Sequence, residues 1–151
     1  MALGQEFGVL SCRGDIRPFD RTRYYEKEMG SNLVRLFAAF RELVEMDRLP
    51  LIKLRSNEIE KQFAVEGCRR VNLDPGYLTA ERIVLATGKN FTHRIYLGQG
   101  IYADLTLLFH RKSFRALPWT YPDYSDPEII GYMNNLRRDY MAQLREEGGT
   151  E

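Results

Sequence analysis

Polar side chains with complementary chemistry alternate with apolar ones just before a proline and a glycine. The run consists of Arg70, Val71, Asn72, Leu73 and Asp74. Its period of two is typical of a strand with one apolar and one polar face. Guanidinium, amide and carboxylate groups on one face suit an anionic or polar ligand. The simpler interpretation is that these groups pair with one another and with nearby backbone, as most buried polar groups do.

The sequence Asp74-Pro75-Gly76-Tyr77 predicts a type II turn directly after this strand. Proline fixes φ at the second position of such a turn, and glycine accepts positive φ at the third. We therefore expect the strand to end at Asp74, with its carboxylate at the rim of a groove.

A second set of polar side chains lies on a predicted hairpin. Residues 92–97 and 101–110 both alternate, and Gly98-Gln99-Gly100 between them is typical of a three-residue loop. A loop of this length sets like residues opposite one another, in the pairs Leu97–Ile101, Tyr96–Tyr102, Ile95–Ala103 and Arg94–Asp104. A two-residue loop would set apolar against polar residues along the ladder. We therefore expect a direct cross-strand pair between Arg94 and Asp104.

The two polar runs define a candidate ligand site if they share one sheet face under the aromatic connection 118–124. The candidate ligand-binding residues are Arg70, Asn72, Asp74, Tyr77, Arg94, Tyr102, Asp104, Trp119, Tyr121 and Asp123. The aromatic residues of the connection either close a pocket or cover the core, and covering the core is the commoner role. A pocket with these groups inside would take a small phosphate-bearing or otherwise polar ligand.

Carboxylates offer the best catalytic hypothesis. In it, aspartates surround a magnesium ion and basic side chains hold a phosphate: Asp74, Asp104 and Asp123, and Arg70, Arg94 and Lys89. The competing interpretation is a structural network of ion pairs, which is the commoner use of a charged sheet face.

The sequence lacks the signatures of common zinc and nucleophile sites. Its histidines, His93 and His110, fall in opposite alternating sets of the hairpin, which argues against zinc. It contains no nucleophile elbow and no Cys–His signature. We expect His93 to be a core histidine with a satisfied partner, we predict no metal, and we assign neither catalytic residues nor a cofactor.

Composition limits the class of protein. With 151 residues, 44% of them hydrophobic, the chain suits a single domain with a real core. Lys and Arg total 22 against 21 Asp and Glu, so the net charge is too small to attract nucleic acid electrostatically. The two cysteines form no disulfide framework, which suits the cytoplasm. No apolar run approaches the roughly 20 residues of a membrane span, and the start lacks a signal peptide.

The elements around these sites follow from periodicity. Residues 7–12 are typical of an edge strand. Apolar spacing over 31–44 favours a helix, with a strand as the serious alternative. Ser56 or Asn57 caps a helix that Gly67 ends. Residues 79–88 form a helix or a buried strand, and the helix is slightly favoured.

The C-terminal third predicts a second hairpin and a long helix. A tight turn at Arg111-Lys112 sets Phe109 opposite Phe114. Ser125 or Asp126 caps a helix with one apolar stripe that packs on the sheet: Ile129, Met133, Leu136, Tyr140 and Leu144. Residues 147–151 form a flexible tail. The fold class is α+β, an antiparallel meander with helices on one face in a single domain, 1–151.

Four stretches carry a family resemblance. They are residues 24–30 (YYEKEMG), 70–78 (RVNLDPGYL), 93–103 (HRIYLGQGIYA) and 117–124 (LPWTYPDY). The chain resembles, over nearly its whole length, an uncharacterised bacterial family known as domain of unknown function 4416. The resemblance implies no activity. It implies that relatives begin with a further strand and helix that this chain lacks, which exposes an edge at Phe7–Cys12 through which a homodimer could form.

Two classes of function fit these observations. One is a small-ligand site on the shared polar face, with catalysis there left open. The other is an interaction module for protein or RNA that uses the bare edge, or Tyr96, Tyr102 and Tyr121 as stacking groups. Knowing which sheet face the C-terminal helix covers would distinguish these two classes of function, because an Arg94–Asp104 pair beneath that helix would be scaffolding.

Overall fold

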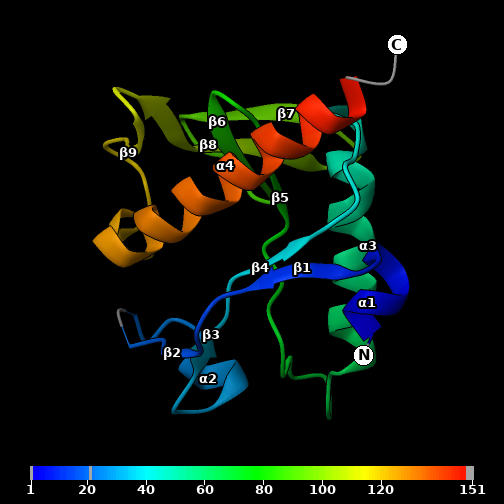
Figure 1. Cartoon of the computed structure of the whole chain (residues 1–151). Coiled ribbons are helices and arrows are strands. Elements are labelled where there is room, and N and C mark those ends of the chain that lie inside the picture. Colours follow the sequence, from blue (N-terminus) through cyan, green and yellow to red (C-terminus); the bar gives the residue numbers. More distant parts are fainter. Residues whose placement is uncertain (1, 21, 149–151) are drawn as a thin grey trace. The chain divides into compact units, whose positions relative to one another are not determined.

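The computed structural model describes residues 2–20 and 22–148 (Figure 1). The chain forms two compact units, Met1–Pro75 and Gly76–Glu151. Helices and antiparallel strands occur in both, which confirms the predicted α+β class. None of the helices in these described ranges is long and apolar enough to cross a membrane.

The first unit contains short ribbons and one long helix. Its elements are α1 (Ala2–Phe7), β1 (Leu10–Arg13), β2 (Arg17–Pro18), α2 (Glu26–Met29), β3 (Val34–Arg35), β4 (Ala38–Phe40), η1 (Met46–Arg48) and α3 (Leu49–Gln62). β1 pairs with β4 and β2 pairs with β3, both antiparallel. The strand predicted over 7–12 begins later, because α1 extends to Phe7. The other edge of β1 has no strand partner within residues 2–20 and 22–148.

The helix favoured over residues 31–44 is wrong, and the alternative strand is right. The segment forms β3 and β4, which pair with strands formed earlier in the chain. Its apolar residues do not form a buried stripe: Leu36, Leu43 and Val44 are 43%, 41% and 53% exposed. Apolar spacing without burial gives a helix no tertiary support, so strand pairing decides the structure.

Helix α3 begins well before the predicted caps. Pro50 lies in its first turn, where the missing N–H and fixed φ of proline are favourable. Ser56 is instead buried inside the helix, and its hydroxyl donates to the Lys53 carbonyl at 2.8 Å. Gly67 (φ 78°) is not the helix C-cap either, because it forms a tight turn with Glu66 between Val65 and Cys68.

The strand and type II turn predicted around residues 70–77 are wrong. Residues 71–75 form no strand ladder, and β5 (Gly76–Leu78) begins where the turn was expected. Gly76 does not adopt positive φ. It lies against the next strand so closely that an added Cβ would stand 2.4 Å from the Val84 carbonyl oxygen. The glycine is therefore required for close packing of two strands and not for a turn.

The second unit is a five-stranded antiparallel sheet with one long helix. It contains β5, β6 (Arg82–Thr87), β7 (Arg94–Gly98), β8 (Ile101–His110), β9 (Ser113–Ala116), η2 (Pro122–Ser125) and α4 (Pro127–Gly148). The strand order is β5-β6-β8-β7, and β9 also pairs with β8. The slight preference for a helix over 79–88 is wrong: the consecutive residues Ile83 and Val84 are both buried, as in a strand covered on both faces.

The predicted hairpin register is confirmed over most of its length. Arg94 pairs with Asp104, Ile95 with Ala103 and Tyr96 with Tyr102. At the turn, however, Gly98 and not Leu97 pairs with Ile101. Gln99 (φ 55°) and Gly100 (φ 75°) form a two-residue turn, and Leu97 is the extra residue of a β-bulge. The bulge absorbs the one-residue difference, so like residues still pair.

A second bulge, at Thr106 of β8, reverses the face to which each later residue of that strand points, compared with simple alternation. Val84 pairs with Leu105 and Ile83 with Leu107, so Thr106 has no counterpart on β6. The sequence pattern placed Leu105 and Leu107 on one face, and this is wrong because the bulge interrupts the alternation. Asp104 therefore shares its face with Leu107 and Phe109.

Helix α4 packs on the sheet as predicted (Figure 1). Asp126 is its cap, since the Asp126 Oδ1 accepts from the Glu128 N–H at 2.9 Å. The predicted pairing of Phe109 with Phe114 is confirmed, and the Arg137 guanidinium lies 3.5 Å from the centre of the Phe109 ring. The helix thus covers, at Phe109, the face that Asp104 shares. By the criterion given above, this favours a scaffolding role for the Arg94–Asp104 pair, whose side chains are 24% and 18% exposed, and a ligand-binding role for the pair stays a prediction. Residues 147–148 of the predicted tail belong to α4, and 149–151 lie outside the described residues.

Candidate functional site

A cluster of charged and aromatic side chains lies where β7 begins beside the middle of β8. His93 Nε2 lies 3.2 Å from Asp104 Oδ2, and Arg94 Nε donates to the same oxygen at 2.9 Å. The three side chains are 12%, 24% and 18% exposed, in the order His93, Arg94, Asp104. Partial burial strengthens these interactions compared with the same pairs in water. The carboxylate oxygen Asp104 Oδ2 thus contacts two basic side chains, those of His93 and Arg94.

The chain just before β7 orients the Arg94 guanidinium. Arg94 Nη1 donates to the Lys89 carbonyl at 3.1 Å. The Phe91 ring lies 5.9 Å from the guanidinium carbon and edge-on to the His93 ring at 5.6 Å. Phe91 therefore contacts both basic groups at distances typical of cation–π and edge-to-face contacts.

Trp119 completes the cluster from the connection between β9 and η2. Its ring stacks on His93 with centroids 4.9 Å apart and an interplanar angle of 14°. Its Nε1 donates to the Leu105 carbonyl at 2.7 Å, and the next residue, Thr120, donates to the Thr106 carbonyl at 2.6 Å. These carbonyls belong to the β8 bulge, so the bulge anchors the connection. Trp119 remains 41% exposed.

The contact with Asp104 indicates a tautomer for the His93 imidazole. A carboxylate only accepts hydrogen bonds, so His93 Nε2 is the donor to Asp104. A carboxylate that holds an imidazole in one tautomer in this way is a recurrent arrangement in acid–base and ligand sites.

The structure brings together only part of the predicted site. Arg94, Asp104 and Trp119 join the cluster, and sequence reasoning missed His93 as a member. The miss has a local cause: His93 lies in the turn before β7, so strand alternation does not fix the face on which it lies. Tyr102 shares the Asp104 face, and its ring contacts Tyr96 with centroids 5.2 Å apart.

The remaining candidates of the second unit lie elsewhere in it. Tyr77 lies in β5 opposite Val84. Tyr121 precedes η2 and is 40% exposed, and Asp123 lies within η2. Among residues 2–20 and 22–148, no group of three or more His, Cys, Asp and Glu side chains could hold a metal ion.

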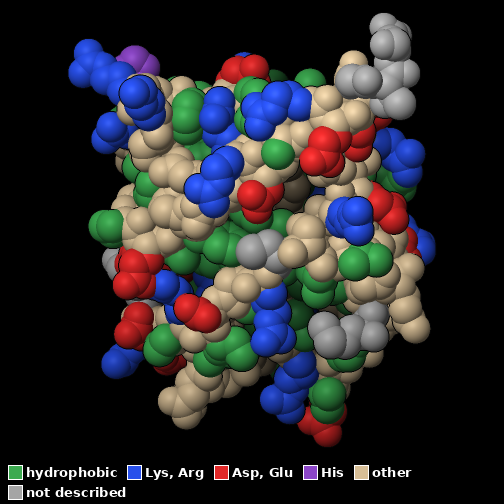
Figure 2. Space-filling model, in the orientation of Figure 1, with side chains coloured by type: hydrophobic (Ala, Val, Ile, Leu, Met, Phe, Trp, Pro, Cys, Tyr) green, Lys and Arg blue, Asp and Glu red, His purple; other side chains and the backbone are tan. Residues whose placement is uncertain are grey.

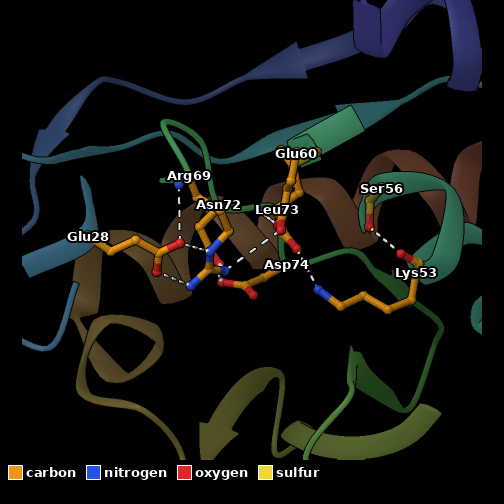
Figure 3. A network of polar contacts seen from close by, with 8 residues as sticks. All are labelled: Glu28, Lys53, Ser56, Glu60, Arg69, Asn72, Leu73 and Asp74. Carbon is orange, nitrogen blue, oxygen red and sulfur yellow. Dashed lines mark hydrogen bonds and ion pairs between the residues drawn. The ribbon is translucent and has the colours of Figure 1, made fainter. Parts of the chain in front are cut away.

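In the first unit, the predicted polar run forms a network of its own (Figure 3). Arg70 is exposed, and its neighbour Arg69 is the central cation. Arg69 donates to both Glu28 carboxylate oxygens, at 2.7 and 2.8 Å, and to Asn72 Oδ1 at 3.0 Å. Asn72 Nδ2 donates to Asp74 Oδ2 at 3.1 Å. The simpler interpretation, that these groups pair with one another, therefore describes Asn72 and Asp74.

Two buried charges on α3 hold the backbone of Leu73. Glu60 Oε1 accepts from the Leu73 N–H at 2.6 Å, and Lys53 Nζ donates to the Leu73 carbonyl at 2.8 Å (Figure 3). Lys53 and Glu60 are only 8% and 6% exposed. These side chains satisfy the peptide N–H and carbonyl of Leu73, which a neighbouring strand would otherwise satisfy.

Charge interactions in this network change the protonation of its members. Hydrogen bonds from Arg69 lower the pKa of Glu28 from 4.5 to about 2. The same contact raises the pKa of the Arg69 guanidinium above its ordinary value. Burial lowers the pKa of Lys53, against the opposing effects of the Asp74 and Glu60 charges. The shifts of Glu28 and Arg69 both favour the charged forms of these side chains, which suits a structural clamp.

The candidates thus divide between the two units. Arg70, Asn72 and Asp74 belong to Met1–Pro75, and the other candidates belong to Gly76–Glu151. A polar face shared by both sets stays a prediction. The cluster of His93, Arg94, Asp104 and Trp119 is assembled within one unit, and for this reason it is the better candidate site.

One family model matches the chain. It is the model of a domain of unknown function (DUF4416), and it matches residues 1–140. The chain therefore belongs to this family, and the resemblance seen in the four sequence stretches is confirmed. No curated protein and no solved structure matches the chain.

Proposed function

We propose that this member of the DUF4416 family binds a small anionic ligand, of the phosphate-bearing kind, at His93, Arg94 and Trp119. The observation that supports the proposal is the sharing of one carboxylate oxygen, Asp104 Oδ2, by His93 and Arg94. The Arg94 guanidinium is always charged and has more N–H donors than this one oxygen engages. A phosphate or carboxylate ligand would accept hydrogen bonds from the other donors.

Arg94 has hydrogen-bonding capacity beyond the protein contacts described. A guanidinium has five N–H donors in a planar fork. Asp104 and the Lys89 carbonyl engage Arg94 through Nε and Nη1. The remaining donors suit the paired oxygens of a phosphate. Trp119, stacked on His93 and still 41% exposed, adds an aromatic surface for a ring of the ligand.

The same site contains a group for acid–base chemistry. The His93 imidazole lies against Asp104 through Nε2, and imidazole is the side chain most often used as a general acid or base. Ligand binding is the proposal, and catalysis on the bound ligand would use this imidazole.

A small ligand is favoured over nucleic acid. The net charge is +1, which gives little electrostatic attraction to a phosphate backbone. The proposal includes a cytoplasmic location, since Cys68 is a free and exposed thiol that a reducing compartment would preserve.

Trp119 allows a direct test because the chain contains a single tryptophan. Inorganic phosphate and a nucleoside monophosphate are titrated while tryptophan fluorescence is recorded. We expect saturable changes, and we expect Arg94→Gln to weaken binding by at least about tenfold, the loss of one charged hydrogen-bond partner.

The matched control is Arg115→Gln, which removes the same charge from an exposed position on β9. It should bind as the unmodified protein does. Equal weakening in both variants, or a linear response to each anion without saturation, would contradict the proposed site.

A further inference from the structure

The loop between β6 and β7, residues 88–93, holds Phe91 beside the proposed ligand site. At its start the Lys89 N–H donates to the Thr87 hydroxyl at 3.2 Å. At its end the Arg94 N–H donates to the Phe91 carbonyl at 3.0 Å, and Arg94 Nη1 donates to the Lys89 carbonyl at 3.1 Å. These hydrogen bonds tie both ends of the loop to the strands, so they define where Phe91 lies.

The Phe91 side chain is 62% exposed although its ring contacts two residues of the site. The ring lies edge-on to the His93 ring with centroids 5.6 Å apart, and its centroid lies 5.9 Å from the Arg94 guanidinium carbon. Exposure alone assigns no role to an apolar side chain, because many surface residues are apolar. The position of this exposed ring beside an arginine with further N–H donors is what points to a ligand.

A second exposed ring contacts the same histidine from a different part of the chain. Trp119 belongs to the connection between β9 and η2, stacks on His93 with centroids 4.9 Å apart and is 41% exposed. Two exposed aromatic rings and one guanidinium are thus gathered around His93. Aromatic rings bind nucleobases by stacking, and guanidinium groups bind phosphates through paired hydrogen bonds. Together these groups match the two ends of a nucleotide.

We propose that the ligand of this site is a nucleotide, a nucleoside 5′-phosphate whose base stacks on Phe91 and whose phosphate is bound by Arg94. The inference rests on the proposed function, from which it takes the anion at Arg94. The Phe91 ring centroid and the guanidinium carbon are 5.9 Å apart, and in a nucleotide a single sugar separates the base from the phosphate. One nucleotide therefore contacts both groups, and Phe91 determines the specificity for a base.

The exposed rings favour a nucleotide over other phosphate-bearing ligands. A sugar phosphate has no π-system, so it gains the contact with Arg94 and no stacking on Phe91. Stacking accepts every base, because each base has a π-face, and for this reason the proposal names a class of ligand and not one base. A nucleic-acid strand fits less well, since a net charge of +1 gives little attraction to a chain of phosphates.

Isothermal titration calorimetry of the full chain with adenosine 5′-monophosphate and ribose 5-phosphate isolates the contribution of the base. We expect the nucleotide to bind at least about fivefold more tightly, the lower limit for stacking one base on an aromatic ring. Phe91→Ala should remove this preference and leave the affinity for ribose 5-phosphate unchanged, which also shows that the variant is folded. Phe91→Tyr keeps a ring at this position and should keep the preference.

The matched control is Phe63→Ala, because Phe63 is an exposed phenylalanine of the first unit, 47% exposed. This variant should bind both compounds as the unmodified protein does. Equal affinities of the unmodified protein for the two compounds would overturn the inference, and so would an unchanged preference in Phe91→Ala. In either case ribose 5-phosphate binding that Arg94→Gln weakens would leave the proposed phosphate site standing. Binding of neither compound would overturn the proposed function and this inference with it.

Discussion

Replacing Glu60 tests whether two buried charges of α3 substitute for a strand partner at Leu73. In Glu60→Ala the Leu73 N–H loses its acceptor at 2.6 Å, and Lys53 loses a nearby opposite charge. A hydrogen bond to a charged group contributes about 1.5–3 kcal/mol. Removing one partner of a buried pair of charges costs about 3–5 kcal/mol. We expect Glu60→Ala to lower the free energy of unfolding by about 3 kcal/mol, near the overlap of these ranges.

Glu60→Gln separates the hydrogen bond from the charge. The amide oxygen still accepts from the Leu73 N–H, while the attraction to Lys53 and Arg69 is lost. We expect a smaller loss, about 1 kcal/mol. Glu58→Gln is the control on the same helix, because Glu58 forms an exposed ion pair with Lys61 and its loss should cost under about 0.5 kcal/mol.

Urea unfolding followed by far-ultraviolet circular dichroism is the assay, since the single tryptophan lies in the other unit. If Glu60→Ala unfolds within about 0.5 kcal/mol of the unmodified protein, the clamp on Leu73 has no energetic role. If Glu60→Gln costs as much as Glu60→Ala, the buried charge matters and the hydrogen bond does not.

Three further predictions concern separate features. The pKa of the Glu28 carboxylate is lowered from 4.5 to about 2, so the carboxylate stabilises the fold above pH 4.5 and this contribution is lost as pH falls toward 2. The free energy of unfolding, measured over that pH range, should therefore fall less in Glu28→Gln than in the unmodified protein. Gly76→Ala should destabilise by about 1–3 kcal/mol because its Cβ would meet the Val84 carbonyl at 2.4 Å, and Gly88→Ala, with nothing within 4 Å, should melt close to the unmodified protein; equal melting temperatures would contradict the close approach. His93→Gln should change the Trp119 fluorescence spectrum, because it removes the ring that stacks on Trp119 at 4.9 Å; an unchanged spectrum would contradict the stacked arrangement.

The hairpin of β7 and β8 was predictable because its polar and apolar residues alternate on both strands. That pattern admits few registers, and Arg94–Asp104 follows from the one that joins like residues. The two bulges were not predictable in this way. An extra residue at Leu97 or Thr106 leaves the composition of the strand unchanged, and only pairing with the neighbouring strand reveals it.

The segment around Leu73 shows a different limit of sequence reasoning. Its alternation indicated a strand, which is wrong, because the backbone of Leu73 is held by side chains of α3, at Lys53 and Glu60. Side-chain partners at such a sequence separation leave no periodic signal. The helix favoured over 31–44 failed for a related reason, because pairing with β1 and β2 outweighed the apolar spacing.

The candidate site was predictable where it depended on the hairpin and not elsewhere. Arg94 and Asp104 follow from the register, and Trp119 follows from its aromatic connection. His93 escaped because a residue in a turn has no face assigned by alternation. The sequence signal that could have found His93 was its position directly before Arg94, the residue predicted to pair with the Asp104 carboxylate.

The unmatched residue at Thr106 has a consequence for how this chain tolerates changes in length. Removing that residue alone would restore simple alternation, and Leu107 would stay on the face of Asp104 and opposite Ile83. A deletion of two neighbouring residues that include Thr106 would instead turn every later side chain of the strand to the opposite face. We therefore expect this strand to keep its sidedness when Thr106 is deleted, at the cost of the contact between its carbonyl and Thr120.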